Sequence, residues 1–133
     1  MDSKDLPALV AAFEEGTLDV KQWTHRAHLS VAFWHLQRFS AEDALNRMRA
    51  GIMHYNECTG TPNTATRGYH ETLTRFWIGV IRRFVRVDPS LPRLLEAYGS
   101  RSDLWRDYYS FDVVRSTGAR AGWVAPDLLQ LDD

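Results

Sequence analysis

Three histidines at helical spacing are the residues of this sequence best suited to chemistry. His25 and His28 lie three positions apart, and His70 follows much later in the chain. Two imidazoles at positions i and i+3 of a helix project from one face and can chelate one ion, and a third from a neighbouring helix completes a face of three nitrogens. Three nitrogens with an open position are the minimum for a catalytic zinc or iron site. We therefore expect a divalent metal, Zn or Fe, at His25, His28 and His70.

Two glutamates are candidates for a fourth ligand. Glu57 closes a helix near the histidines, and Glu71 directly follows His70. Because adjacent residues on a helix point about 100° apart, Glu71 turns away from His70 and pairs more naturally with Arg75 at i+4. Glu57 is therefore the preferred additional metal ligand.

Further polar residues in the same segments suit catalysis and substrate binding. Tyr69 and Tyr55 are candidate proton donors, and Glu71 is a further candidate for acid-base work. Arg67 and Arg75 are candidates for orienting an anionic substrate, because guanidinium groups form paired hydrogen bonds to carboxylates and phosphates. The alternative for both arginines is a solvated helix surface.

The remaining histidines and the cysteine are expected to lie outside this site. His35 is two turns from His28, about 10 Å along the helix axis, and should hydrogen-bond to a side chain of the next helix. His54 is expected at the surface. Cys58 is the single cysteine, so it forms no internal disulfide, and a lone cysteine is usually inert.

A metal-free interpretation of the three histidines stays open. A histidine on an apolar stripe is usually a core residue whose ring nitrogens are hydrogen-bonded. Burying three neutral imidazoles without partners is costly, and a metal would satisfy all three at once. The alternative is a hydrogen-bonded histidine cluster or an acid-base site without metal.

Helices must position these residues, because strand-like alternation is nearly absent. Apolar residues recur at helical spacing over residues 4–15, 24–39, 41–57 and 65–87. Caps are expected at Thr24, at Ser40 and at position 63 or 64. A set of apolar side chains should be buried together: Leu29, Ala32, Leu36, Leu45, Met48, Ile52, Leu73, Trp77, Ile81 and Phe84.

The connections between these helices predict the fold. Short connections favour an up-down arrangement, which brings the starts of the second and fourth helices to the same end of the bundle. A shorter helix is expected from position 90 or 91 to Tyr98. The aromatic-rich remainder should pack across the bundle as a lid or flank. We predict a single all-α domain over residues 1–133: an up-down bundle of about four main helices with this segment packed across it.

Composition limits the partners. The 133 residues carry 16 Lys and Arg against 17 Asp and Glu, a net charge of −1, so no global field draws the protein to nucleic acid or to an anionic membrane. No stretch reaches the ~18 apolar residues of a membrane span, and the N-terminus does not resemble a secretion signal. A cytoplasmic location is expected, and no dinucleotide or phosphate-binding glycine motif is present.

Two longer strings carry a family resemblance. WTHRAHLSVAF and RGYHETLTRFW resemble short, functionally uncharacterised bacterial all-helical proteins that pair a T-H-x-x-H-L helix start with a Y-H-E-T helix start. The resemblance covers the second to fourth helices and implies no particular reaction. It implies a shared site at Thr24, His25, His28, Tyr69, His70, Glu71 and Thr72. In outline the bundle is also similar to DinB-like metal-dependent transferases, which use three histidines at a different spacing.

Two classes of function are compatible with these features. The first is a metal-dependent enzyme that acts on a small molecule, by hydrolytic or oxygen-using chemistry. The second is a non-catalytic metal- or ligand-binding module such as a sensor. In a variant of this second class, a metal-free histidine cluster would accompany dimerisation through exposed aromatic residues.

Overall fold

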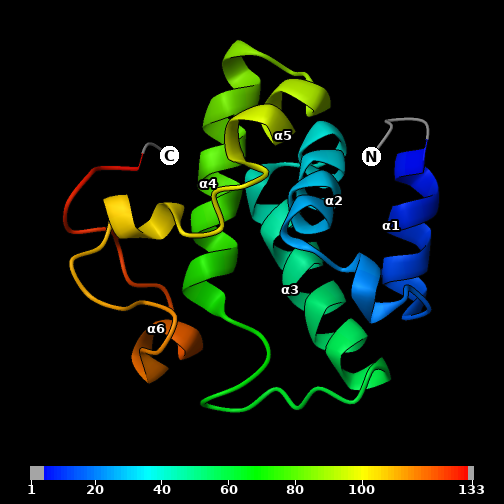
Figure 1. Ribbon diagram of the computed structural model, residues 1–133, viewed down its shortest axis with the longest axis horizontal. Helices are drawn as coiled ribbons and strands as arrows, with labels where there is room; N and C mark the ends of the chain where they lie inside the picture. The colour runs from blue at the N-terminus through cyan, green and yellow to red at the C-terminus, as the bar shows by residue number, and fades with distance from the viewer. Residues whose placement is uncertain (1–4, 132–133) are drawn as a thin grey trace.

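The structure is a computed structural model that describes residues 5–131, and its regular elements in that range are all helical (Figure 1). The α-helices are α1 (Leu6–Glu15), α2 (His25–Arg38), α3 (Ala41–Cys58), α4 (Glu71–Val87), α5 (Leu91–Tyr98) and α6 (Thr117–Ala121). Two short 3₁₀ helices are η2 (Val20–Gln22) and η3 (Leu104–Asp107). The predicted all-α fold is confirmed, although position 4, the expected start of the first helix, lies outside the described residues. Within residues 5–131, no helix is long and apolar enough to cross a membrane.

Two of the predicted caps start helices as expected. Thr24 precedes α2, and its hydroxyl accepts a hydrogen bond from the backbone N–H of Ala27. Ser40 precedes α3 and accepts one from the N–H of Asp43 at 3.1 Å. Each bond satisfies an N–H group that the first turn of a helix leaves without a backbone partner. The start of α2, where two of the candidate histidines lie, is therefore fixed by its own sequence.

The fourth helix begins later than the predicted residue 65. Asn63 does not cap it, because its side-chain oxygen accepts a hydrogen bond from the N–H of Tyr69 within the preceding loop. Gly68 adopts a left-handed backbone (φ 82°), so a right-handed helix that includes α4 cannot extend back through this residue. The N-cap of α4 is His70. This candidate metal ligand thus lies at the helix boundary rather than inside the first turn.

The helices form a bundle in which α2 and α3 lie in the middle. Figure 1 shows α1 along one side of this pair and α4 along the other, and α1 and α4 each contact both helices. The short helix α5 packs on α2 and α4, and α6 packs on α4. The start of α2, with His25, and the start of α4, with His70, thereby come to the same part of the bundle, as expected from the connections between the helices.

The C-terminal segment, residues 99–131, packs along α4. It forms a second apolar cluster with the side of α4 that faces away from the bundle, and its buried members are Phe76, Val80, Leu104, Tyr108, Tyr109, Val113 and Ala119. The hydroxyl of Tyr109 donates to the carbonyl of Val124 at 2.7 Å, which holds two parts of the segment together. The expectation that this aromatic-rich segment packs across the bundle is confirmed.

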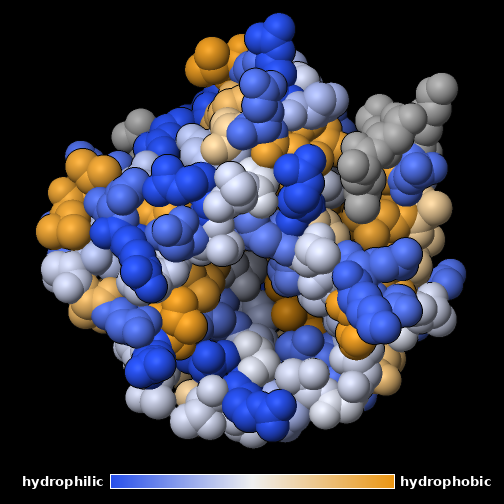
Figure 2. Space-filling model, viewed as in Figure 1, coloured by the Kyte–Doolittle hydropathy of each residue, from blue (hydrophilic) through white to orange (hydrophobic). Residues whose placement is uncertain are grey.

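The expected core is only partly closed. Five of its members are buried: Leu29, Ala32, Met48, Ile52 and Ile81. The others are half-buried: Leu36, Leu45, Leu73, Trp77 and Phe84. Figure 2 shows the reason for Leu73 and Trp77, because the face of the molecule is hollowed at its centre, where α4 faces α2 and α3 in Figure 1.

Candidate functional site

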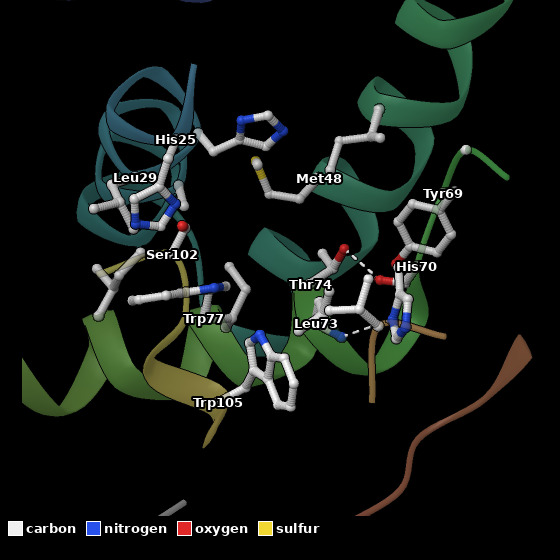
Figure 3. A pocket seen from close by; sticks show the side chains of 17 residues that line it. His25, Leu29, Met48, Tyr69, His70, Leu73, Thr74, Trp77, Ser102 and Trp105 are labelled. Carbon is white, nitrogen blue, oxygen red and sulfur yellow. Dashed lines mark hydrogen bonds between the residues drawn. The ribbon is translucent and has the colours of Figure 1, made fainter. Parts of the chain in front are cut away.

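A cavity of about 360 Å³ lies between α2, α3 and α4. Its apolar lining comes from Leu29, Ala32, Met48, Ile52, Leu73, Trp77, Ile78, Ile81, Trp105 and Val114. Its remaining lining comes from His25, His28, Gly68, Tyr69, His70, Thr74 and Ser102 (Figure 3). A mostly apolar cavity of this size with a few polar groups is typical of small-molecule sites. The three candidate histidines and Tyr69 therefore reach one cavity, beside the middle of α3.

His25 lines the cavity with one ring nitrogen free. Its Nε2 lies 3.0 Å from the carbonyl oxygen of Tyr98. A carbonyl only accepts hydrogen bonds, so Nε2 carries the proton and Nδ1 keeps its lone pair. The ring also meets Trp77 edge-on, with centroids 4.8 Å apart. His25 is thus anchored to the end of α5 and offers an acceptor on the other side of its ring.

His28 has the opposite tautomer. Its Nδ1 donates to the carbonyl of Thr24 at 2.8 Å, so Nε2 holds the lone pair. Trp23 covers the ring, with centroids 3.8 Å apart. Burial lowers the pKa of His28 to about 4 and also lowers the pKa of His25, because desolvation disfavours the charged imidazole. Both rings are therefore neutral near pH 7, and each offers a hydrogen-bond acceptor.

His70 has no ring nitrogen left for a ligand. Its Nδ1 accepts a hydrogen bond from the N–H of Leu73, which makes the side chain the cap of α4. Its Nε2 donates to the carbonyl of Val113 at 2.8 Å. Burial lowers the pKa of His70, so this neutral form persists. His70 joins the start of α4 to the C-terminal segment, which is a structural function.

The three histidines do not fit a metal site in this arrangement. Among residues 5–131, no group of three or more His, Cys, Asp or Glu side chains is placed to hold a metal ion. Since both nitrogens of His70 are engaged, His25 and His28 supply only two free imidazole nitrogens, below the three expected for a catalytic zinc site. The divalent metal expected from the sequence remains a prediction.

Glu71 lies in an ion pair that the sequence did not indicate. Arg49 on α3 contacts both of its carboxylate oxygens, at 2.8 and 2.6 Å, and the hydroxyl of Tyr69 donates to it at 2.7 Å. The arginine holds the pKa of Glu71 below its usual range, and burial raises the pKa of Tyr69. The expected partner, Arg75, instead lies over the ring of Trp123. Because Glu71 does not line the cavity and the hydroxyl of Tyr69 is committed to it, neither is placed for acid-base chemistry there.

Four other expected site residues lie away from the cavity. Tyr55 is buried, but its hydroxyl donates to the carbonyl of Leu18, on the side of α3 that α1 covers. Glu57 is exposed, and so are Arg67 and Arg75. Tyr55 and Glu57 do not line the cavity because it lies beside the middle of α3 and not beside its C-terminal end.

The two histidines expected outside the site are indeed outside it. His35 is buried, and its Nδ1 donates to the carbonyl of Val31 in its own helix. This ring nitrogen therefore does not form the expected hydrogen bond to a side chain of α3. His54 is exposed, as predicted. Cys58 is also exposed, and its sulfur lies 3.5 Å from Nε2 of His54.

Three lining residues come from the C-terminal segment and were not identified from the sequence. Ser102 and Val114 are exposed, while Trp105 is half-buried. The aromatic content of the segment indicated that it packs on the bundle. Nothing in that content specified which of its residues would face the histidines. Helical periodicity, the signal used elsewhere, is weak here because η3 and α6 are short.

Comparison with known proteins adds no family assignment: no protein-family model, curated protein or solved structure matches the chain.

The Y-H-E-T string has a physical explanation in the structure. Thr72, its last residue, is buried, and its hydroxyl donates to the carbonyl of Gly122 and accepts from the N–H of Val124. Like His70, Thr72 ties α4 to the C-terminal segment. The string therefore helps to build one wall of the cavity. The free hydrogen-bond acceptors of the cavity come instead from His25 and His28.

Proposed function

We propose that the protein binds a small organic molecule in the central cavity, with His25 and His28 as the polar groups that recognise it. One observation carries this proposal: two neutral imidazoles line the same largely apolar cavity, and each has one ring nitrogen bonded to a backbone carbonyl and the other free. The carbonyl bonds fix the tautomers and the ring orientations. The free nitrogens are thereby held in place before a ligand arrives.

Pre-positioned acceptors of this kind are suited to ligand recognition. Side chains already held in their binding geometry lose little freedom when the ligand enters, so more of the interaction energy appears as affinity. A partly enclosed imidazole nitrogen also gains from a partner that replaces water. The apolar lining would supply most of the binding free energy, and the two nitrogens would orient the molecule.

The same two residues can also act on a bound molecule. A neutral imidazole is the usual general base of enzymes, and Nε2 of His28 or Nδ1 of His25 can accept a proton from a ligand within hydrogen-bonding distance. A pKa of about 4 makes His28 a weak base at neutral pH, so proton abstraction, if the ligand is turned over, would rest on His25. This activity needs no metal, unlike the metal-dependent enzyme expected from the sequence.

The methionines provide a direct test of binding. Met48 lines the cavity, whereas Met53 is exposed and does not. With [¹³C]methyl-methionine protein, a screen of uncharged aromatic and aliphatic fragments should include compounds that shift the Met48 methyl resonance and leave Met53 unchanged. The indole N–H signals of Trp77 and Trp105 should move with Met48.

The control for this screen is within the molecule. A fragment that shifts Met53 as much as Met48 binds non-specifically, and such fragments would not count as support. If no fragment at millimolar concentration moves Met48, the cavity is not a small-molecule site and the proposal is wrong.

A further inference from the structure

We infer that the molecule bound in the cavity is an uncharged aromatic compound that donates a hydrogen bond, such as a phenol of one or two rings. This inference rests on the proposed function and adds the chemical class of the ligand. Three properties of the cavity lead to it: the charge of its lining, the direction of its hydrogen-bonding groups, and its aromatic walls and size.

Within the described part of the chain, residues 5–131, the lining carries no charged side chain. None of the 17 residues that line the cavity is Asp, Glu, Lys or Arg. Moving an ionised carboxylate or ammonium group out of water without a partner is very costly. Two nearby arginines are turned elsewhere, since Arg49 pairs with Glu71 and Arg120 donates to the carbonyl of Gly68. A carboxylate, phosphate or ammonium ligand would therefore lack a counter-charge in this cavity.

The free ring nitrogens of the two histidines are acceptors, and the exposed hydroxyl of Ser102 can donate or accept. Nδ1 of His25 and Nε2 of His28 each present a lone pair, and the ring nitrogens that carry protons face backbone carbonyls. The hydroxyl of Thr74 is already donated to the carbonyl of His70. A ligand with an O–H group complements these two nitrogens, whereas a ligand with only acceptors would face lone pair against lone pair.

Aromatic walls and the available volume point to one or two rings. The side chains of Trp77 and Trp105 line the cavity (Figure 3), and both are half-buried, so part of each ring is available to a ligand. Aromatic rings pack favourably on such surfaces in offset or edge-on geometry. An apolar protein cavity of ~150 Å³ holds one benzene molecule. At about 360 Å³ this cavity has room for a naphthalene-sized compound.

Four probes of nearly equal shape test the inference by titration calorimetry on the intact protein. They are 2-naphthol, 2-methoxynaphthalene, 2-naphthoate and 2-naphthylmethylammonium. We expect 2-naphthol to bind at least about tenfold more tightly than 2-methoxynaphthalene, which corresponds to the loss of one hydrogen bond to a buried acceptor, ~1.4 kcal/mol. The two charged probes should bind more weakly than both.

Variants locate the effect. In the double variant His25→Leu, His28→Leu, which removes both acceptors, 2-naphthol should lose its advantage over 2-methoxynaphthalene while the methoxy compound binds about as before. His54→Leu is the matched control, because His54 is exposed and remote from the cavity lining, and it should keep the full difference. The comparison of the two neutral probes on the unaltered protein does not depend on whether a variant folds.

The outcomes separate this inference from the proposed function. Equal binding of 2-naphthol and 2-methoxynaphthalene, with Met48 shifted by both, would overturn the donor requirement and leave the cavity as a binding site. Tighter binding of either charged probe would overturn the uncharged class. If none of the four probes binds while other fragments shift Met48, this inference fails and the proposed binding function stands; if no fragment shifts Met48 either, both fail.

Discussion

The two sides of the α2–α3 pair are packed very differently. Against α1, Phe13 stacks on Trp23 at 4.3 Å and is fully buried, and the hydroxyl of Tyr55 is bonded to a backbone carbonyl. Against α4, Leu73 and Trp77 are only half-buried and border a cavity. The same two helices form both sides, so their sequence is capable of close packing. The open side is therefore a specific property of the residues that face α4.

Trp23 connects the two sides. One aromatic neighbour is Phe13 on the closed side, and another is His28, which lines the cavity. A side chain of the closed core thus orients a residue of the open one. The close packing beside α1 therefore helps to hold the ring of His28 in place at the cavity, and binding sites require polar groups that are held in this way.

The largest expected effect comes from the closed side. Phe13→Ala should lower the free energy of unfolding by about 3–5 kcal/mol, because the side chain of Phe13 is fully buried and its removal leaves a void. Trp77→Ala should cost less, roughly 1–2 kcal/mol, since its side chain already borders a cavity. Urea denaturation of both variants measures the difference. Equal losses would mean that the two sides are packed alike.

Histidine substitutions should separate structure from binding. His70→Ala should cost roughly 2–3 kcal/mol, because it removes the cap of α4 and leaves the carbonyl of Val113 without its donor. His28→Ala should cost under about 1 kcal/mol in unfolding free energy and should weaken the hydrogen-bond contribution to ligand binding, since His25 still offers its acceptor. The check is denaturation and calorimetry on both variants. A stable His70→Ala protein that has lost binding would reverse the two assignments.

Acidification should weaken the open side first. In the unfolded chain a histidine binds a proton below its ordinary pKa near 6.5, whereas burial holds the pKa of His28 in the folded protein to about 4. The unfolded state therefore binds more protons between these values, and stability falls as pH drops from 6.5 toward 4, by roughly 1–2 kcal/mol for this group. His28→Gln should flatten that part of the pH profile, measured by denaturation at several pH values. An unchanged slope would show that His28 titrates normally.

The smallest expected effect is that of metal ions. Because only two imidazole nitrogens are free, Zn²⁺ or Fe²⁺ at 0.1 mM, an arbitrary test concentration, should change the melting temperature by no more than about 1–2 °C. Thermal unfolding and elemental analysis of untagged protein provide the measurement. A full equivalent of metal that is lost in His70→Ala would restore the three-histidine site expected from the sequence.

Much of the fold could be predicted because its signals are local. Thr24 and Ser40 were recognisable as caps, and the apolar stripes of α2 and α3 have helical spacing. Gly16 is a further local signal, because α1 ends there with a left-handed backbone (φ 77°), which glycine adopts readily. The start of α4 was missed because Asn63, a good cap by type, bonds within the loop instead. Residue type alone does not determine which N–H group a cap residue will meet.

Only part of the membership of the candidate site was predictable, and its chemistry was not. Helix phase and connectivity were enough to bring His25, His28 and His70 to one cavity. The fate of each ring nitrogen was not predictable, because it depends on carbonyls of distant segments, such as those of Tyr98 and Val113. These long-range partners decide whether a histidine is a ligand or a structural tie, and no periodicity in the sequence encodes them.

The position of Ser102, Trp105 and Val114 at the cavity has a consequence for how specificity can change. These residues belong to a segment that joins the bundle through α4, by bonds such as those of Thr72 and His70, and they do not hold α2 and α3 together. Substitutions in this segment can reshape one wall of the cavity while α2 and α3 keep their packing against α1. One half of the cavity is thus held by the packing of the bundle, whereas the other half belongs to a segment that can be altered to change which ligand the cavity selects.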